Sequence, residues 1–210
     1  MAVDTLPRAL VNVAEKFPQR VALRKKEFGI WEDIPWSTYL QKVRYVALGL
    51  HALGVRKGDH VAIIGENQPE WLYSALGTMA IGAAFVGIYT TNPAAECQYV
   101  VAHSGSKVYL CEDEEQLDKA LAFRENTPQL KKLIVWDMEG LRHFQDPMLM
   151  SFEELLALGR TLNQENPNLF AALLHSWGDF SIVSYIYSSN LHFERFYHNP
   201  REENLHDTYT

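Results

Sequence analysis

Residues 181–189, SIVSYIYSS, begin in the way that a nucleotide-binding segment begins. An apolar run followed by small hydroxyl residues is typical of a buried strand that leads into a phosphate loop. Glycines in such a loop let backbone N–H groups close around phosphate oxygens, and a lysine adds a positive charge. Here Asn190, Leu191 and His192 follow, and the sequence from residue 190 to residue 210 contains neither glycine nor lysine. The segment therefore lacks the residue types that would complete a phosphate site.

The turn after the apolar run 60–65 is a second candidate nucleotide site, in the phrase HVAIIGENQPEW. A dinucleotide site at the first strand-to-helix turn needs the spacing G-x-G-x-x-G, so that the backbone can approach a pyrophosphate closely. Gly65 is the one glycine of this phrase. We therefore favour an ordinary strand-to-helix turn over a nicotinamide or flavin site.

Metal and nucleophile chemistry are also weakly supported. Cys97, His103 and Cys111 do not have the close ligand pairs of structural zinc sites, so we interpret the cysteines as core thiols and the histidine as a surface residue. The polar terminus holds three further histidines: His192, His198 and His206. Scattered histidines in such a terminus are more typical of solvated residues than of ligands. No metal site is predicted. With no G-x-S-x-G elbow in the sequence, no catalytic residue is nominated.

The elements that would position these residues alternate between apolar runs and helical patterns. Runs typical of buried strands occupy residues 60–65, 83–89, 107–111, 132–137 and 181–187. Helices are predicted between them, with capping signals at Asp113 and Gln116 and at Ser151 and Glu154. This alternation predicts an α/β fold with a mostly parallel, doubly wound sheet and flanking helices.

The N-terminal region precedes this alternation. We predict a helix over residues 4–17, then two short strands that turn near Phe28 and Gly29. Ser37 is expected to cap a further helix that Gly54 ends. Residues 138–150 and the phrase TLNQENPN after Arg160 are predicted to be loops.

Composition limits the classes of function. The chain has 210 residues, of which 47% are hydrophobic, enough for one large domain or for one domain and part of another. Its net charge of −7 argues against a nucleic-acid partner. No segment approaches about 18 uninterrupted apolar residues, so no transmembrane segment is expected. Asp4 and Glu15 interrupt the N-terminus, which has no signal-peptide core. Two cysteines do not suggest a disulfide scaffold. We expect a cytoplasmic protein, with peripheral contact to membranes left open.

Several longer phrases carry more specific information, among them GENQPEW, GIYTTNP and EEQLDK, preceded by WEDIPWSTYLQKVRYVALGL. In this order and at these separations they resemble the N-terminal part of AMP-forming acyl-CoA synthetases of the adenylate-forming superfamily. They are most similar to the long-chain fatty acid–CoA ligase group. The resemblance runs from about Leu6 to Tyr187 and implies the N-terminal subdomain of such an enzyme, in an incomplete form. The same phrases are also compatible with ordinary α/β packing.

The resemblance gives the segment at 187–189 a meaning. The family's phosphate loop reads approximately Y-T-S-G-T-T-G-x-P-K-G, so Tyr187, Ser188 and Ser189 correspond to its start as remnants of an ATP-binding loop. A complete enzyme would use ATP, Mg²⁺ and coenzyme A to convert a fatty acid to its acyl-AMP and then to a thioester. Because the rest of the loop and all later motifs are missing, the chain alone is predicted to be inactive and to use none of these cofactors.

The resemblance also divides the chain. Residues 1–189 are expected to form the N-terminal part of an AMP-dependent synthetase domain, and residues 190–210 a divergent, poorly ordered tail. We expect the change at residue 190 to reflect a premature end, caused by a frameshift, an altered splice or an interrupted gene.

Two other hypotheses remain open. The chain could be a non-catalytic α/β module that binds a partner such as a full-length synthetase, through the N-terminal surface that long-chain members use for dimerisation. A homodimer through that surface is the related possibility. The chain could also be an unstable product without function, because a partial domain leaves apolar faces uncovered.

Overall fold

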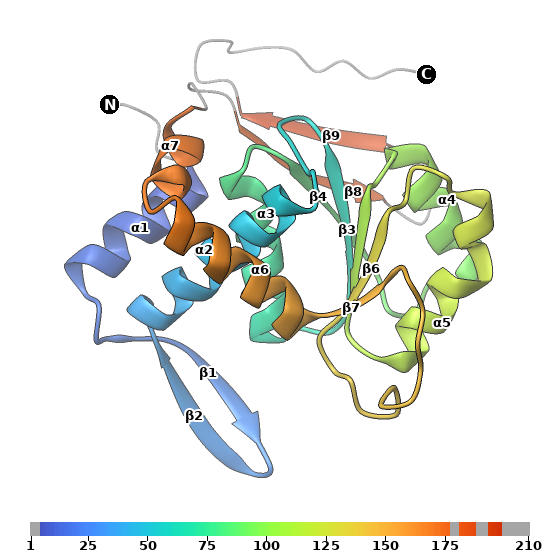
Figure 1. Cartoon of the computed structure of the whole chain (residues 1–210), viewed down its shortest axis with the longest axis horizontal. Coiled ribbons are helices and arrows are strands. Elements are labelled where there is room, and N and C mark those ends of the chain that lie inside the picture. Colours follow the sequence, from blue (N-terminus) through green and yellow to red (C-terminus); the bar gives the residue numbers. More distant parts are fainter. Residues whose placement is uncertain (1–4, 177–180, 188–192, 199–210) are drawn as a thin grey trace.

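The computed structural model describes residues 5–176, 181–187 and 193–198, the last two ranges through their backbone. The helices are α1 (Leu6–Lys16), α2 (Trp36–Ala52), α3 (Pro69–Ala80), α4 (Ala94–Ser104), α5 (Glu114–Phe123), α6 (Phe152–Glu165) and α7 (Leu169–His175), with a 3-10 turn at Arg124–Asn126. The strands are β1 (Val21–Glu27), β2 (Ile30–Pro35), β3 (His60–Ile64), β4 (Ala84–Ile88), β5 (Val108–Cys111), β6 (Lys132–Val135), β7 (Leu149–Ser151), β8 (Ser181–Tyr187) and β9 (Phe193–His198). In Figure 1 the larger sheet lies between two groups of helices.

The larger sheet has the order β7-β6-β5-β3-β4-β8-β9 within the described part of the chain. Each neighbouring pair from β7 to β8 is parallel, and β9 pairs with β8 antiparallel. Since β4 lies on one side of β3 and β5 on the other, the chain reverses its direction across the sheet after β4. The prediction of a mostly parallel, doubly wound α/β fold is confirmed.

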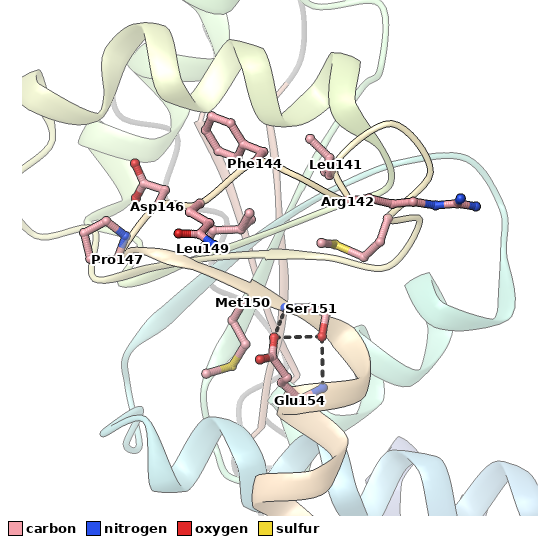
Figure 2. A pocket seen from close by; sticks show the side chains of 11 residues that line it. Leu141, Arg142, Phe144, Asp146, Pro147, Leu149, Met150, Ser151 and Glu154 are labelled. Carbon is pink, nitrogen blue, oxygen red and sulfur yellow. Dashed lines mark hydrogen bonds between the residues drawn. The ribbon is translucent and has the colours of Figure 1, made fainter.

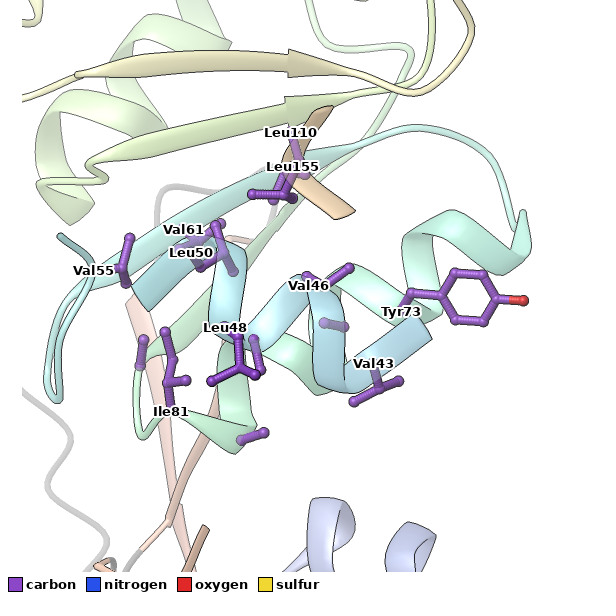
Figure 3. Packing of buried hydrophobic residues seen from close by; sticks show 14 of the residues in the cluster. Val43, Val46, Leu48, Leu50, Val55, Val61, Tyr73, Ile81, Leu110 and Leu155 are labelled. Atoms are coloured by element: carbon purple, nitrogen blue, oxygen red, sulfur yellow. The ribbon is translucent and has the colours of Figure 1, made fainter. Parts of the chain in front are cut away.

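Alternation along β3 shows how the two faces of the sheet are buried. Val61 and Ile63 pack in the same cluster as residues of α2, α3, α6 and α7, whereas Ala62 and Ile64 pack with residues of α4 and α5. Successive side chains of a strand point to opposite faces, so a continuous apolar run is what a sheet covered on both sides requires. Figure 3 shows part of the first cluster, with Leu50 of α2 drawn beside Val61 and Leu155 of α6 drawn beside Leu110.

Three glycines let the helices of this first layer approach one another closely. A Cβ atom at Gly159 of α6 would overlap the carbonyl oxygen of Tyr45 in α2. A Cβ atom at Gly49 of α2 would overlap the carbonyl oxygen of Leu155 in α6. Gly77 of α3 makes a similar contact with α2, because its Cβ atom would lie 2.7 Å from Cγ1 of Val46. Helix α2 is therefore held between α3 and α6 at backbone-to-backbone distance.

Strands β1 and β2 form a separate two-stranded antiparallel sheet that projects from the body (Figure 1). Their turn is at Phe28, with φ of 47°, and Gly29, with φ of 84°. The turn predicted near these two residues is confirmed. Leu23 and Ile34 pack against the main core and hold the base of the hairpin.

Side-chain caps begin α1, α5 and α6 among the described helices, and two expected caps are confirmed. The side chain of Asp113 accepts a hydrogen bond from the Gln116 N–H, and Ser151 and Glu154 form a complete capping box. The cap expected at Ser37 is wrong, because α2 begins at Trp36 with Pro35 as its N-cap residue. Proline's fixed φ and an extended backbone already suit an N-cap, so no side-chain cap is used there.

Some elements differ from the prediction. Helix α6 continues to Glu165 through part of the predicted loop after Arg160, because Leu162 packs against the core and extends the apolar face. Strand β7 overlaps the end of the region predicted to be a loop, and its three residues are too few to show a period. Helix α7, which has no side-chain cap, and strand β9 are both absent from the sequence prediction. The predicted poor order of residues 190–210 stays a prediction.

In the part of the chain that the structure describes, none of the helices is both long enough and apolar enough to cross a membrane.

The contact at Gly159 can be tested with Gly159→Ala. Alanine is more favourable than glycine inside a helix by about 1 kcal/mol, so the substitution would stabilise a helix position that has no close neighbour. Here the added methyl group meets the Tyr45 carbonyl oxygen, and we expect the free energy of unfolding to fall by roughly 2 kcal/mol or more. Urea unfolding followed by circular dichroism measures this. Thr161→Ala, on an exposed position of the same helix, is the control and should change stability little. A stabilised Gly159→Ala protein would contradict the described packing.

Candidate functional site

The carboxyl ends of the parallel strands meet at one edge of the sheet, called here the carboxyl edge. After β3 the chain turns towards α3 on one face, and after β4 and β5 it turns towards α4 and α5 on the other. Ligands of open α/β sheets bind in the crevice that such diverging connections leave. In a fold of this kind the carboxyl edge is therefore the expected position of a ligand site.

A pair of glutamates connects the segments that follow β3, β4 and β5. Glu112 accepts a hydrogen bond from the backbone N–H of Glu66 at 2.7 Å, across 46 residues of sequence. Glu66 in turn accepts from the hydroxyl group of Thr90 at 2.9 Å. We call Glu66, Thr90 and Glu112 the glutamate clamp, because together they hold three loops in one arrangement.

Lys119 of α5 also contacts the clamp, through Thr90. Its ammonium group donates to the backbone carbonyl of Thr90 at 2.6 Å and to Oε1 of Gln116 at 2.9 Å. It also lies 3.6 Å from a carboxylate oxygen of Glu115. The charge of Lys119 is thus already engaged within the protein.

Close packing continues at the ends of β3 and β6. The indole ring of Trp136 lies directly over Gly65, where a Cβ atom would overlap it, and the side chain of Glu112 lies beside the same position. The Asp137 N–H donates to the carbonyl of Glu112 at 2.7 Å. Gly65 is therefore needed for close approach here.

The electrostatic character of the carboxyl edge is acidic. Burial raises the pKa of Glu112, and the negative charges of Asp113, Glu66 and Asp137 raise it further, against the hydrogen bond from the Glu66 N–H. Four carboxylates at one edge disfavour a further negative charge.

These residues do not fit the phosphates of ATP. The charged groups at the edge are mainly carboxylates, and the Lys119 ammonium group is engaged. Among the residues that were described, His, Cys, Asp and Glu side chains form no group of three or more able to hold a metal ion. The described edge positions loops, and phosphate or Mg²⁺ binding would need further residues.

Of the three residues predicted to contact ATP, the structure describes Tyr187. Tyr187 is the last residue of β8, whose backbone runs parallel to β4, so it ends at the carboxyl edge. Ser188 and Ser189 lie outside the described residues. Their contact with a nucleotide stays a prediction.

The interpretation of the cysteines as core thiols is confirmed. Cys97 and Cys111 are free and fully buried between the sheet and helices α4 and α5. Burial is the main cause that raises the pKa of both thiols, which argues against reactive thiolates. His103 is exposed and stacks on Tyr99.

The predicted solvated histidines of the terminus fall largely outside the described side chains. His192 and His206 lie outside the described residues, and His198 is described through the backbone of β9 alone.

A hollow lies between the loop before β7 and the start of α6, with a volume of about 620 Å³ (Figure 2). Its walls include Leu141, Phe144 and Met150. Two of its acidic groups are already bound, because Asp146 pairs with Arg124 and Glu154 is part of the capping box. Binding pockets usually combine apolar walls with a few converging polar groups that remain available. We therefore place the candidate site at the carboxyl edge and not in this hollow.

The glutamate clamp was missed in the sequence. The usable signal was position, since Glu66 and Glu112 each follow a predicted strand within two residues. Parallel strands bring such residues to a common edge.

Several known proteins resemble this chain in sequence. The sequence model of AMP-binding enzymes matches residues 10–168. The human long-chain-fatty-acid–CoA ligase ACSBG1 is 32% identical over 161 residues, which are 77% of this chain and 22% of the relative. The protein of the same name from Bos taurus is 28% identical over 183 residues, 83% of this chain and 25% of the relative. The chain thus spans about a quarter of the length of these relatives.

Solved structures show the same fold. The A-PCP didomain of carboxylic acid reductase from Segniliparus rugosus has a TM-score of 0.77 and 18% identity, covering 93% of this chain and 32% of that one. The N-terminal domain of FACL13 from Mycobacterium tuberculosis has a TM-score of 0.71 and 19% identity, covering 93% of this chain and 44% of that one. With the family match over most of the chain, these findings show that the chain belongs to the family of AMP-binding enzymes and is related to its acyl-CoA ligases.

Proposed function

We propose that this chain is the N-terminal part of a long-chain fatty acid–CoA ligase, a scaffold on which the nucleotide-binding parts of the complete enzyme assemble. The family match over residues 10–168 carries the proposal. The complete enzyme would take a fatty acid, ATP, Mg²⁺ and coenzyme A and form an acyl-AMP and then an acyl thioester. The relatives named as long-chain-fatty-acid–CoA ligases support this substrate class.

The role proposed for the described residues is positional. The glutamate clamp and Lys119 fix the loops after β3, β4 and β5, and β8 ends beside them. Tyr187, Ser188 and Ser189 would then enter the site from the end of β8. A rigid edge of this kind lets other segments bring cations to a nucleotide in a defined geometry.

Catalysis by the 210-residue chain alone is expected to be absent. The acidic edge offers no compensation for phosphate charge, and positioning and electrostatic stabilisation supply most of the rate in phosphoryl and acyl transfer. Loss of one stabilising donor typically costs about 10² to 10³ in rate. We expect no palmitate-dependent exchange of labelled pyrophosphate into ATP above a heat-denatured control. Exchange well above that control would show that residues assigned to scaffolding handle ATP.

A chimera tests the function itself. Residues 10–168 replace the matching segment of the human ligase ACSBG1, and thioester formation with palmitate and coenzyme A is measured. We expect a rate within about tenfold of the parent, equivalent to about 1.4 kcal/mol in activation free energy, because the scaffold is shared. The human ligase with the segment deleted is the inactive control. A chimera that folds but forms no thioester would contradict the proposal. If it also binds unmodified ligase, the alternative of a non-catalytic module that binds a full-length synthetase is favoured.

The glutamate clamp gives a pH prediction for Glu112→Gln. The pKa of Glu112 is raised in the folded protein, so its ionisation opposes folding as the pH rises through that pKa. Glutamine still accepts the hydrogen bond from the Glu66 N–H but carries no charge. We expect the variant to be at least as stable as the parent at pH 7, with a difference that shrinks as the pH falls and Glu112 becomes protonated.

Urea unfolding between pH 4 and pH 8 measures this difference. Glu139→Gln, which removes an exposed carboxylate, is the control and should show no such pH-dependent gain. A Glu112→Gln protein that is clearly less stable at pH 7 would show that the clamp depends on the charged carboxylate.

A further inference from the structure

The loop between β4 and α4 presents an uncharged surface at the carboxyl edge. Residues 71–95 contain no aspartate, glutamate, lysine or arginine. The exposed residues of the loop are Tyr89, Thr91 and Pro93. Trp71 covers β4 just before the loop, because its indole ring lies 3.8 Å from the position of a Cβ atom on Gly87. This aromatic cover ends before Tyr89, whose side chain is 67% exposed among the residues that the structure describes.

The loop is held in one conformation by its neighbours. The Thr90 hydroxyl group donates to Oε1 of Glu66 at 2.9 Å, and the Thr90 carbonyl accepts from the Lys119 ammonium group at 2.6 Å. The Asn92 N–H donates to the Tyr89 carbonyl at 3.0 Å. A tyrosine on a fixed backbone loses little conformational freedom on binding, and tyrosine is enriched at the centres of protein interfaces. The loop therefore has the properties of a docking surface.

Carboxylates lie beside this uncharged loop and select the charge of its partner. We call them the acidic rim: Glu66, Glu112, Asp113 and Asp137. They are close enough together that the other three raise the pKa of Glu112. Lys119, the cation that contacts the clamp, also lies 3.6 Å from a carboxylate oxygen of Glu115. Such a rim repels nucleic acids and anionic headgroups and attracts a cationic partner.

A segment of polypeptide suits this combination better than a metal ion. Within the described ranges, His, Cys, Asp and Glu side chains form no group of three or more able to hold a metal. An arginine or lysine can lie on the face of a tyrosine ring and reach a carboxylate with its charged end. Aromatic residues at the centre and charged residues at the rim are the usual anatomy of a protein interface.

The source of such a segment follows from charge and from the position of β8. Residues 188–210 contain two arginines and four acids, a net charge of −2, so they have the same sign as the acidic rim. Strand β8 lies beside β4 and parallel to it, so the chain that follows β8 in a complete ligase begins at this edge (Figure 1). About three quarters of each matched relative has no counterpart in this chain.

From the fixed, exposed loop and the charge beside it, we propose that the loop between β4 and α4, with Tyr89 at its centre, docks a basic segment of the part of an acyl-CoA ligase that this chain lacks. An arginine or lysine of that segment lies on the Tyr89 ring and pairs with carboxylates of the acidic rim. The source of the segment rests on the proposed function, whereas the chemistry of the surface belongs to this chain alone.

A basic peptide tests the surface in the 210-residue chain itself. The probe is a fluorescein-labelled octapeptide of alternating arginine and glycine, and its charge-reversed counterpart alternates glutamate and glycine. Fluorescence anisotropy at low salt should show binding of the arginine probe, weaker as salt is added, and no binding of the glutamate probe. Tyr89→Ala should weaken binding of the arginine probe at least about fivefold, because the central ring is lost.

Tyr99→Ala is the matched control, since Tyr99 is another exposed tyrosine, 45% exposed, in α4. It should leave probe binding unchanged. Asp137→Asn removes one charge of the acidic rim and should weaken binding about twofold or more at low salt. Glu165→Gln removes an exposed charge outside the rim, at the end of α6, and should not. Thermal unfolding of each variant checks that the fold is retained, and the exposed Tyr89 ring contributes little to it.

A photo-crosslink identifies the occupant in the chimera with the human ligase ACSBG1. Tyr89→p-benzoylphenylalanine is introduced into the residues 10–168 of the chimera, which is irradiated and digested with chymotrypsin. Mass spectrometry should find a crosslinked peptide from the human part with a net positive charge. The same replacement at Tyr99 is the control and should not crosslink to that peptide.

Three results would overturn the docking surface. The parent chain does not bind the arginine probe, Tyr89→Ala binds it as the parent does, or the crosslink reaches a second copy of the chain or no basic peptide of the human part. An active chimera without that crosslink removes the docking surface and leaves the proposed function intact. An inactive chimera in which the crosslink forms contradicts the proposed function and supports the surface.

Discussion

The close contact between helices α2 and α6 is the constraint on which the rest of the structure depends. Gly49 and Gly159 bring the two backbones together, and Gly77 lets α3 lie against the other side of α2. These contacts fix one helical layer, whose apolar side chains then cover Val61, Ile63 and Leu110 of the sheet. Without that layer the sheet would expose one apolar face, and the carboxyl edge would lose its support.

The carboxyl edge inherits its arrangement from this packing, and its chemistry is restrictive. In the glutamate clamp, the carboxylates of Glu66 and Glu112 accept hydrogen bonds that hold loops together, and the Lys119 ammonium group donates to one of the same loops. An edge built from engaged and mutually repelling groups favours a fixed shape over affinity for phosphate. The chain spans about a quarter of the length of the relatives it matches, so a large part of each relative has no counterpart in this chain.

Much of the fold could be predicted because the core strands have unbroken apolar runs and two helices carry side-chain caps at Asp113 and Ser151. Elements without such signals were missed, namely β7 with three residues and α7 without a side-chain cap. The hydrogen bond from Glu66 to Glu112 was beyond sequence reasoning for a different reason. It requires β5 to lie beside β3, and local patterns do not specify strand order.

The path from β7 to β8 has a consequence for the way the chain folds. Strand β7 lies at one end of the parallel set, and the chain returns through α6 and α7 to place β8 beside β4. During synthesis the outer edge of β4 therefore has no strand partner until residue 181 has emerged, although β3, β5 and β6 can already pair. Non-local pairings of this kind form slowly, and an unpaired edge is open to other chains meanwhile. Among the described parallel strands, the last to be made is thus the one that covers the open edge of β4.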